Sequence, residues 1–259
     1  MPTLPAGRAA IIILASLWFA GCASTSTRLT HAPTDPYEKL NRGTYRVNDA
    51  LDKAILRPVA KGYKNVTPQP VQTGVSNFVA NMEMPGTLLN DILQGKFRAA
   101  VADTGRLLLN TTMGIGGLFD VAAKAGIDHN EEDFGQTLGK WGVPAGPYIV
   151  IPLLGPSDLR DAPSRVVDLF TNPAHYANWP ASYGYTLVSN VNKRADLLSL
   201  DETVNKAFDP YAFLRDAYLK NRAYKVADGD VPDEELVDPE ADNPPAAAPP
   251  GPAPAPAKH

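Results

Sequence analysis

The sequence is poor in the residue types from which metal centres and nucleophilic sites are built. Its only cysteine is Cys22, which excludes an intramolecular disulfide and a zinc site made from several cysteines. The four histidines are scattered along the 259 residues, and no two of them stand at the spacing of helical metal ligands. We therefore expect neither a metal ion nor another cofactor.

Catalytic motifs are also missing. The segment GPSDL at 155–159 lacks the final glycine of a nucleophile elbow, and we expect Ser157 to cap the next helix instead. The acidic group of Asp128 and Glu131–Asp133 lacks the spacing of a calcium-binding loop and is typical of an exposed turn. The glycines within Met113–Gly117 lack the dinucleotide-binding spacing and predict a helix end. An enzyme is therefore not expected, although a lipid-anchored phospholipase remains an alternative.

Runs of basic residues are absent as well. The formal net charge is −4, but Asp228–Asp242 contains eight acidic residues and no basic one, so the rest of the chain is close to neutral. No Lys/Arg run is interleaved with aromatic residues, as binding to a phosphate backbone would require. We expect no nucleic-acid partner.

An apolar run near the N-terminus is too short to cross a membrane. Ala9–Ala20 contains about twelve residues, which at about 1.5 Å per helical residue do not span a bilayer. Because Arg8 precedes this run, residues 1–21 are predicted to be a signal peptide.

The end of that peptide, FAGC at 19–22, resembles the lipobox of bacterial lipoproteins, with Phe19 in place of the usual leucine. The resemblance implies that Cys22 is acylated and becomes the new N-terminus, and that acyl chains hold the protein on a membrane at about 0.8 kcal/mol per buried methylene. Ala23 after the cysteine implies sorting to the outer membrane. A signal peptide cleaved elsewhere, with an incidental thiol, is the alternative.

Composition divides the mature chain into three parts. Residues 22–34 are rich in Ser and Thr and predict a lipidated tether. Residues 35–227 carry the helical periodicity of a folded domain. Residues 228–259 are acidic and then rich in Pro and Ala, which is typical of a disordered tail because too little apolar surface is present to fold.

Apolar residues recur at spacings of three and four along residues 36–58, which predicts an amphipathic helix ending near Pro58. Asp35 is expected to cap it, with Glu38 completing a capping box. No alternating run of strand length occurs except the proline-broken Tyr148–Leu154, so we predict an all-α single domain. Further helices are predicted at 71–81, from Pro85 onward, and at 97–111, 118–125, 164–170, 180–198, 201–208 and from Pro210 onward.

The segment Phe134–Asp161 fits no ordinary element. Nine glycines and prolines interrupt it, yet its middle, Tyr148–Leu154, is apolar. Irregular apolar backbone is costly unless its polar groups face protein or a wet cavity. A buried loop across a globular core and a loop beside a wet cavity are both compatible with this pattern.

Short motifs follow one another in a recognisable order, and the densest of them lie within Phe134–Asp161. From Cys22 to about Tyr224 they resemble the MlaA (VacJ) family of outer-membrane lipoproteins. The motifs include DPYE with Asn41-Arg42, Ser76-Asn77-Phe78, Phe134-Gly135, Gly146-Pro147-Tyr148 and Leu159-Arg160-Asp161. The signature positions among them are Asn41, Asn77, Phe134, Gly135, Gly146, Pro147 and Tyr148.

The resemblance implies a ring of amphipathic helices in the inner leaflet of the outer membrane, around an amphipathic channel. It implies removal of mislocalised phospholipids from the outer leaflet and their delivery to a soluble periplasmic lipid carrier, without hydrolysis. It also implies a trimeric porin as partner. A lipid-anchored structural partner of a porin, without lipid transfer, is the alternative outside enzymes.

Three polar residues follow the apolar run of the central segment and are our candidates for the lining of the channel: Arg160, Asp161 and Asp168. A charge at membrane depth is costly unless it faces water or a partner. The alternative is that they form ordinary helix caps and ion pairs. The family motif favours Asp161.

Overall fold

The computed structural model describes residues 35–230. The predicted signal peptide, the tether with Cys22 and the tail from residue 231 onward lie outside the described residues. Asp228, at the predicted start of the tail, is described and contacts the folded domain: its carboxylate pairs with Lys96 and, at 2.9 Å, with Lys140.

The first helical segment is longer than predicted. The helix α2 (Glu38–Leu51) continues through a π-helical turn, η1 (Asp52–Leu56), into α3 (Arg57–Val66) without a break. Pro58 lies in the first turn of α3, directly after the π-helical turn, where the widened backbone tolerates a residue without an N–H group. Proline therefore does not end the helix here.

The capping box predicted at the start of α2 does not form. Tyr37 is the N-cap residue and makes no side-chain cap hydrogen bond. The Asp35 carboxylate instead accepts hydrogen bonds from Asn41 Nδ2 at 2.9 Å and from the Tyr211 hydroxyl. Asp35 therefore forms tertiary hydrogen bonds instead of a local helix cap.

Two predicted helices are one. The helix α4 (Gln69–Gln94) runs through Pro85 and ends at Gly95, whose φ of 77° is left-handed. It contacts α5, α7, α8 and α9, and this packing outweighs the local cost of proline. Gly86 allows the close approach: a Cβ there would lie 2.6 Å from Thr171 Oγ1.

The central segment contains one short β-hairpin, a detail that the prediction of an all-α domain did not include. The strand β1 (Tyr148–Ile151) pairs antiparallel with β2 (Gly155–Asp158), with Tyr148 opposite Asp158 and Ile151 opposite Gly155. Two residues of the turn have left-handed backbone: Leu153 at φ 65° and Gly155 at φ 81°. The mostly helical single domain is otherwise as expected.

Most of the remaining helices overlap the predicted ones, but the short helices at 134–140 and 173–176 were not predicted. Their bounds are α5 (Phe97–Thr112), α6 (Val121–Lys124), α7 (Phe134–Lys140), α8 (Asp161–Thr171), η2 (Pro173–Tyr176), α9 (Trp179–Asp196), η3 (Leu197–Leu200), α10 (Asp201–Lys206) and α11 (Pro210–Val226).

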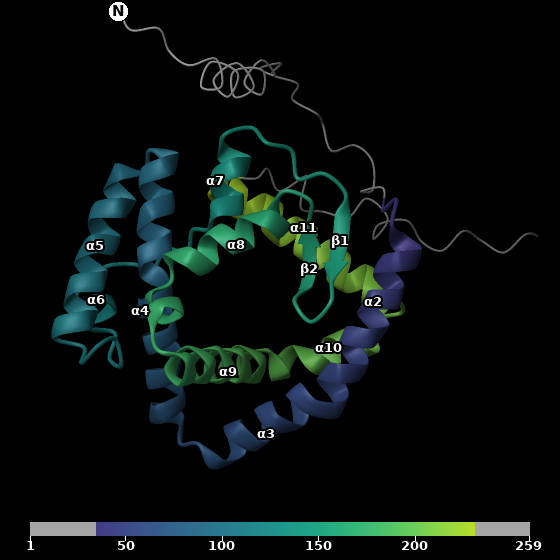
Figure 1. Ribbon diagram of the computed structural model, residues 1–259, viewed down its shortest axis with the longest axis horizontal. Helices are drawn as coiled ribbons and strands as arrows, with labels where there is room; N and C mark the ends of the chain where they lie inside the picture. Colours follow the sequence, from purple (N-terminus) through teal and green to yellow (C-terminus); the bar gives the residue numbers. More distant parts are fainter. Residues whose placement is uncertain (1–34, 231–259) are drawn as a thin grey trace, which may run out of the picture. The chain divides into compact units, whose positions relative to one another are not determined.

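Contacts between elements close a circuit. The strand β1 packs on α2, α3 packs on α9, α9 on α4, α4 on α7 and α8, and α8 on β2, which returns to β1. Figure 1 shows these helices arranged around a central opening, with the hairpin between α2, α8 and α11.

The interior is more polar than that of an ordinary globular domain. Among the described residues, ten hydrophobic side chains are buried, against eighteen polar or charged ones. The buried apolar cluster consists of Tyr148, Val150 and Tyr211, with Tyr45, Tyr218 and Leu219 packed against it. Hydrogen bonds and ion pairs therefore hold much of this fold together.

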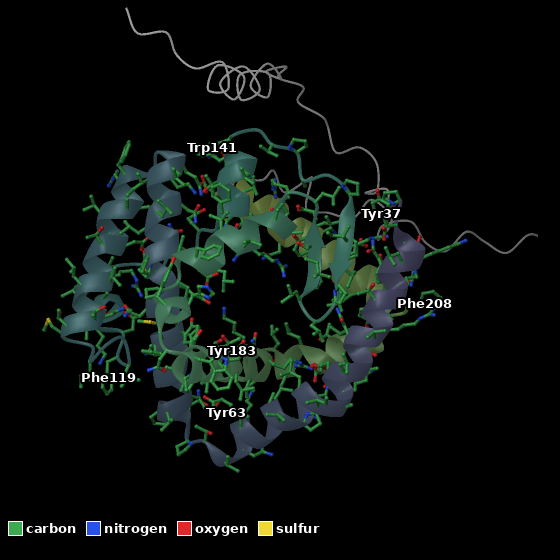
Figure 2. The ribbon with its side chains drawn as sticks, viewed as in Figure 1. Tyr37, Tyr63, Phe119, Trp141, Tyr183 and Phe208 are labelled. Atoms are coloured by element: carbon green, nitrogen blue, oxygen red, sulfur yellow. The ribbon has the colours of Figure 1, made fainter. Side chains whose placement is uncertain are left out.

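Large apolar side chains are exposed along several helices instead. Leu40 and Val47 on α2, and Phe97 and Val101 on α5, are more than half exposed. Figure 2 shows Tyr37, Phe119, Trp141 and Phe208 at the periphery of the helices. Exposed apolar surface of this extent is typical of a surface that meets lipid or another protein. Within residues 35–230, no helix combines the length and apolar composition needed to cross a bilayer.

Candidate functional site

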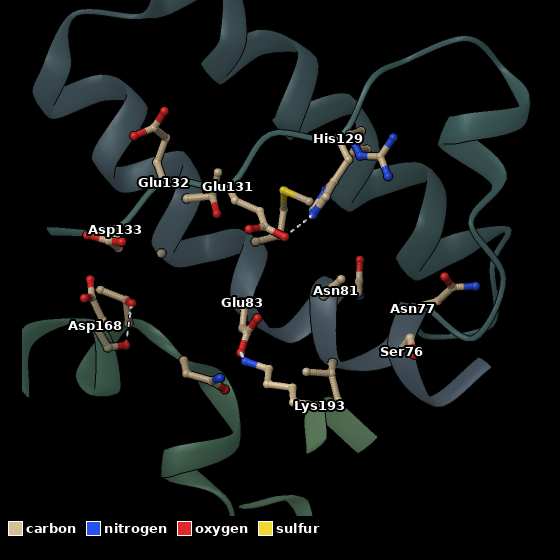
Figure 3. Close-up of a pocket in the computed structure, with 18 of the residues that line it drawn as sticks. Ser76, Asn77, Asn81, Glu83, His129, Glu131, Glu132, Asp133, Asp168 and Lys193 are labelled. Atoms are coloured by element: carbon tan, nitrogen blue, oxygen red, sulfur yellow. Dashed lines mark hydrogen bonds and ion pairs between the residues drawn. The ribbon is translucent and has the colours of Figure 1, made fainter. Parts of the chain in front are cut away.

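A cavity of about 830 Å³ lies beside α4 and is bordered by the strap of residues 127–133 between α6 and α7, by α8 and by α9 (Figure 3). Polar side chains dominate its wall. Its charged residues are Glu83, Arg106, Asp120, Glu131, Glu132, Asp133, Arg165, Asp168, Lys193, Asp196 and Lys225, with His129. An apolar exterior around a polar cavity is the arrangement expected of an amphipathic passage.

Ion pairs fix the strap at the mouth of this cavity. Glu131 pairs with His129 at 3.4 Å and with Lys225 at 3.0 Å, and Glu132 pairs with Lys96 at 2.7 Å. The hydrogen bond from His129, helped by Lys225, holds the pKa of Glu131 at about 2. The strap is therefore anchored to α5 and α11 by charge.

A buried ion-pair cluster joins α7, α8 and α11 next to the cavity. Arg222 donates both terminal nitrogens to the Asp133 carboxylate at 2.6 Å and also pairs with Asp161. Asp161 accepts further hydrogen bonds from Arg160 Nε at 2.8 Å and the Tyr218 hydroxyl at 2.9 Å. Burial raises the pKa of Asp161, but the bonds from Arg160 and Arg222 outweigh it and lower the pKa.

Gly135 is required by this cluster. A Cβ at this position would lie 2.4 Å from both Arg222 Nη2 and Asp161 Oδ1, and 2.9 Å from Ser164 Oγ. The signature glycine thus leaves room for the ion pair at the start of α7. Its neighbour Phe134 donates its backbone N–H to Asp168 Oδ1 at 2.8 Å.

Asp158, not Ser157, accepts hydrogen bonds at the start of α8, whose N-cap residue is Arg160. The Asp158 carboxylate accepts the backbone N–H groups of Arg160 and Asp161 at 2.9 and 2.7 Å. Ser157 only donates to a neighbouring carbonyl at 3.5 Å, so the predicted cap was assigned to the wrong residue. The carboxylate fits because a negative charge is favourable at a helix N-terminus.

The three candidate channel residues fall into two groups. Arg160 and Asp161 are 8% and 4% exposed and lie in the ion-pair cluster, and neither belongs to the wall of the cavity. Asp168 does line the cavity. Burial, followed by repulsion from Asp133, raises its pKa to about 6, and Figure 3 shows the two carboxylates facing each other.

The other signature residues hold the hairpin and the turn after α5. Asn41 and Tyr148 are buried together, and Asn41 Nδ2 donates to the Tyr148 carbonyl at 3.0 Å. Gly146 has a φ of 72°, directly before Pro147. Asn77 donates to the Leu118 carbonyl at 3.2 Å and lines the cavity.

The sequence interpretation missed several residues of the site. Asn48 donates to the Ile151 carbonyl at 3.0 Å and accepts the Leu153 N–H at 2.8 Å. Its signal was present, because it follows the signature Asn41 by seven residues on one helix face. Arg165 and the Lys193–Glu83 pair carried no local signal, since their partners lie on other elements.

Two carboxyl groups are buried side by side between α4 and α5. Asp91 and Asp103 are both fully buried, and Asn130 of the strap donates to each, at 2.9 and 3.4 Å. Burial, the hydrogen bond with Asp103 and its charge raise the pKa of Asp91 to about 7. The pair therefore retains a shared proton near neutral pH.

We expect Asp91→Asn to stabilise the protein at alkaline pH. The pKa of Asp91 is higher in the folded than in the unfolded state, so its stabilisation is complete below the unfolded value near 3.9 and is lost as pH rises through about 7. An asparagine still donates to Asp103 but cannot ionise. At pH 8 the free energy of unfolding of the variant should exceed that of the wild type by about 1 kcal/mol or more, which raises Tm by about 3 °C. The gain should vanish at pH 5.

Thermal unfolding followed by circular dichroism at both pH values measures this difference. Glu202→Gln is the control, because Glu202 is an exposed acid that pairs only with Lys206 one turn away. A variant less stable than the wild type at pH 8 contradicts the shared proton.

Comparisons with known proteins agree with this arrangement. A family model described as MlaA lipoprotein matches residues 33–225. The chain is 36% identical over 226 residues to the intermembrane phospholipid transport system lipoprotein MlaA of Escherichia coli, covering 86% of this chain and 89% of that protein. It is 33% identical over 230 residues to the protein of the same name from Haemophilus influenzae, covering 84% and 89%.

An uncharacterised protein of Rickettsia felis is 40% identical over 195 residues, which are 74% of this chain and 78% of that protein. A solved chain, from work on the structural basis for maintenance of bacterial outer membrane lipid asymmetry, superposes with a TM-score of 0.68 at 35% identity. The superposition covers 74% of this chain and 99% of the solved one.

Proposed function

The chain belongs to the MlaA lipoprotein family, and from this premise we propose that it is an outer-membrane lipoprotein that transports phospholipids and so maintains the lipid asymmetry of that membrane. Phospholipids that have reached the outer leaflet are its cargo. It moves them without breaking a bond, so it is not an enzyme. The family relationship agrees with the motifs of the sequence.

The observation that carries this proposal is the contrast between the polar cavity and the apolar exterior. A phospholipid has a charged headgroup that is costly to move through hydrocarbon, and acyl chains that are costly to expose to water. The cavity of about 830 Å³ offers polar contacts to the headgroup. Exposed side chains such as Leu40, Val47 and Val101 offer apolar contacts to acyl chains outside.

The proposal extends to the partners. Lipidation at Cys22 would hold the ring on the periplasmic side of the outer membrane, against a trimeric porin. A soluble periplasmic carrier would receive the lipid. The exposed apolar side chains of α2 and α5 support a partner or lipid contact, because a monomer in water rarely leaves so many uncovered. The cavity favours a lipid transporter over a purely structural partner of a porin, which needs none.

We expect cavity-filling to abolish transport. Ala80 lines the cavity, and Ala80→Trp would place an indole where a headgroup must pass. In the source bacterium, an amine-reactive reagent that does not cross membranes measures phosphatidylethanolamine at the cell surface. Deletion of the gene and Ala80→Trp should both raise this labelling several-fold.

The matched control is Ala123→Trp, at an exposed alanine of α6 that does not line the cavity. It should keep wild-type labelling at the same protein level. Unchanged labelling in the deletion strain would refute phospholipid transport, and raised labelling in the deletion strain alone would refute passage through this cavity.

A further inference from the structure

Two residues of opposite charge stand one turn apart on α8 and both line the cavity: Arg165 and Asp168. Side chains three residues apart on a helix are neighbours on its surface, about 5–6 Å between Cβ atoms. Neither takes part in an ion pair within residues 35–230. This distinguishes them from most charged groups of the cavity wall.

The other cations of the wall are neutralised by carboxylates. Lys193 pairs with Glu83 at 2.5 Å, and Lys225 pairs with Glu131 at 3.0 Å. Arg106 pairs with Asp120 at 2.8 Å, and His129 lies 3.4 Å from Glu131. In the part of the chain that the structure describes, Arg165 is thus the cation of the wall that lacks an acidic partner.

Backbone carbonyls hold the guanidinium of Arg165 without cancelling its charge. Nη1 donates to the Leu154 carbonyl at 3.2 Å and Nη2 to the Pro156 carbonyl at 2.7 Å, both in the hairpin. A guanidinium has five N–H donors, so donors remain for a phosphate oxygen. The hairpin orients the side chain and leaves a positive charge at the cavity.

The acidic member of the pair is equally uncompensated. Asp168 Oδ1 accepts the backbone N–H of Phe134, and the carboxylate faces Asp133 rather than a base. Asp133 is itself neutralised by Arg222, at 2.6 Å. Burial and Asp133 raise the pKa of Asp168, and within residues 35–230 no cation forms an ion pair with it. Asp196, the other wall acid without an ion pair, is exposed.

We propose that Arg165 and Asp168 form a headgroup site for phosphatidylethanolamine, in which the guanidinium binds the phosphate and the carboxylate binds the ammonium group. In this headgroup a two-carbon linker joins the two charges, so a cation and an anion one helical turn apart match it. The inference rests on the proposed transport function and adds a substrate preference to it.

The same wall disfavours an anionic headgroup. Phosphatidylglycerol carries a phosphate but no ammonium, so it would leave the Asp168 carboxylate without a partner and add a net negative charge beside it. Like charges at close range in a partly buried site repel strongly. Charge-assisted hydrogen bonds to both ends of a zwitterion are therefore the better match.

Native mass spectrometry of the full-length lipidated protein in mild detergent tests the site. The protein is exchanged against equal amounts of phosphatidylethanolamine and phosphatidylglycerol, and bound lipid is identified by mass. The wild type should hold phosphatidylethanolamine with a preference of about tenfold. Asp168→Asn should remove this preference, because the ammonium loses its charged partner.

Arg165→Gln should lower the occupancy of both lipids, since both carry a phosphate, and Arg165→Lys, which keeps the charge, should restore part of it. Glu202→Gln on α10 neutralises an exposed acid far from the cavity wall and should behave as the wild type. Circular dichroism checks that each variant is folded.

Equal binding of the two lipids by the wild type, or an unchanged ratio in Asp168→Asn, overturns the headgroup site while leaving transport intact. A wild-type protein that retains neither phospholipid overturns the proposed function itself.

Discussion

Replacement of Arg222 by methionine is expected to destabilise the fold by about 3 kcal/mol, because it leaves the Asp133 carboxylate without a cation and leaves the buried Asp161 with Arg160 alone. Asp161 is 4% exposed and Asp133 is held by two bonds of 2.6 Å from the same guanidinium. The loss of one arginine therefore removes the ion pairs that join α11 to both α7 and α8, while the Tyr218 hydroxyl still donates to Asp161. The midpoint of thermal unfolding should fall by about 10 °C.

Arg215→Met on the same helix is the matched control. Within residues 35–230, Arg215 pairs with Asp216 alone, which is 39% exposed, so the loss should be about 1 kcal/mol or less. A second variant, Arg222→Met with Asp133→Asn, removes the carboxylate that lost its cation and should recover part of the stability. If Arg222→Met unfolds at the same temperature as Arg215→Met, water reaches the ion-pair cluster and the prediction is wrong.

Most helices of this fold were predictable because they have an apolar face of helical period, and the caps of α11 and α6 are local. The short α7, which contains two glycines, was not predicted. Asp209 accepts the N–H groups of Tyr211 and Ala212 as its sequence context suggests. Pro58 and Pro85 led to wrong helix boundaries for the same reason. The cost of a proline inside a helix can be read from the local sequence, but the π-helical turn and the packing of α4 that offset this cost arise from the tertiary structure.

The hairpin was not predictable from periodicity. Each of its strands has four residues, and Pro156 interrupts the second. The stabilising contacts come from α2, more than a hundred residues away in the sequence, through side-chain amides rather than a third strand. An alternation of apolar and polar residues in the sequence does not reveal such a contact.

The three predicted channel residues lie in two different places for a similar reason. Arg160, Asp161 and Asp168 are close in sequence, but α8 turns its first residue toward Arg222 and the later one toward the cavity. The sequence predicted charged channel residues on and just before this helix, and their role in transport stays a prediction. It did not indicate which charge had a partner, because Arg222 lies 61 residues beyond Asp161.

Asn41→Ala is expected to release the hairpin from α2. The side chain is 1% exposed, and its Nδ2 donates to the Tyr148 carbonyl while its Oδ1 accepts the Val150 N–H at 2.9 Å. Alanine would leave both backbone groups buried without a partner, at about 1–3 kcal/mol each. We therefore expect a loss of about 2–5 kcal/mol in the free energy of unfolding.

Asn48→Ala provides a control of the same residue type on the same helix. Asn48 makes the equivalent pair of bonds to Ile151 and Leu153, but at a partly exposed end of the strand where water can replace the amide. Its loss should be about 1 kcal/mol. Urea unfolding of the two variants measures the difference, and equal losses would contradict the role of burial.

Asn41→Asp separates hydrogen bonding from packing. Aspartate keeps the acceptor for the Val150 N–H, but it cannot donate to the Tyr148 carbonyl, and it adds a negative charge beside the Asp35 carboxylate that now accepts from Asn41. We expect it to be no better than alanine at neutral pH and to recover stability as pH falls and the aspartate is protonated. Because hairpin carbonyls orient Arg165, losing this clamp should also weaken phospholipid retention by the cavity.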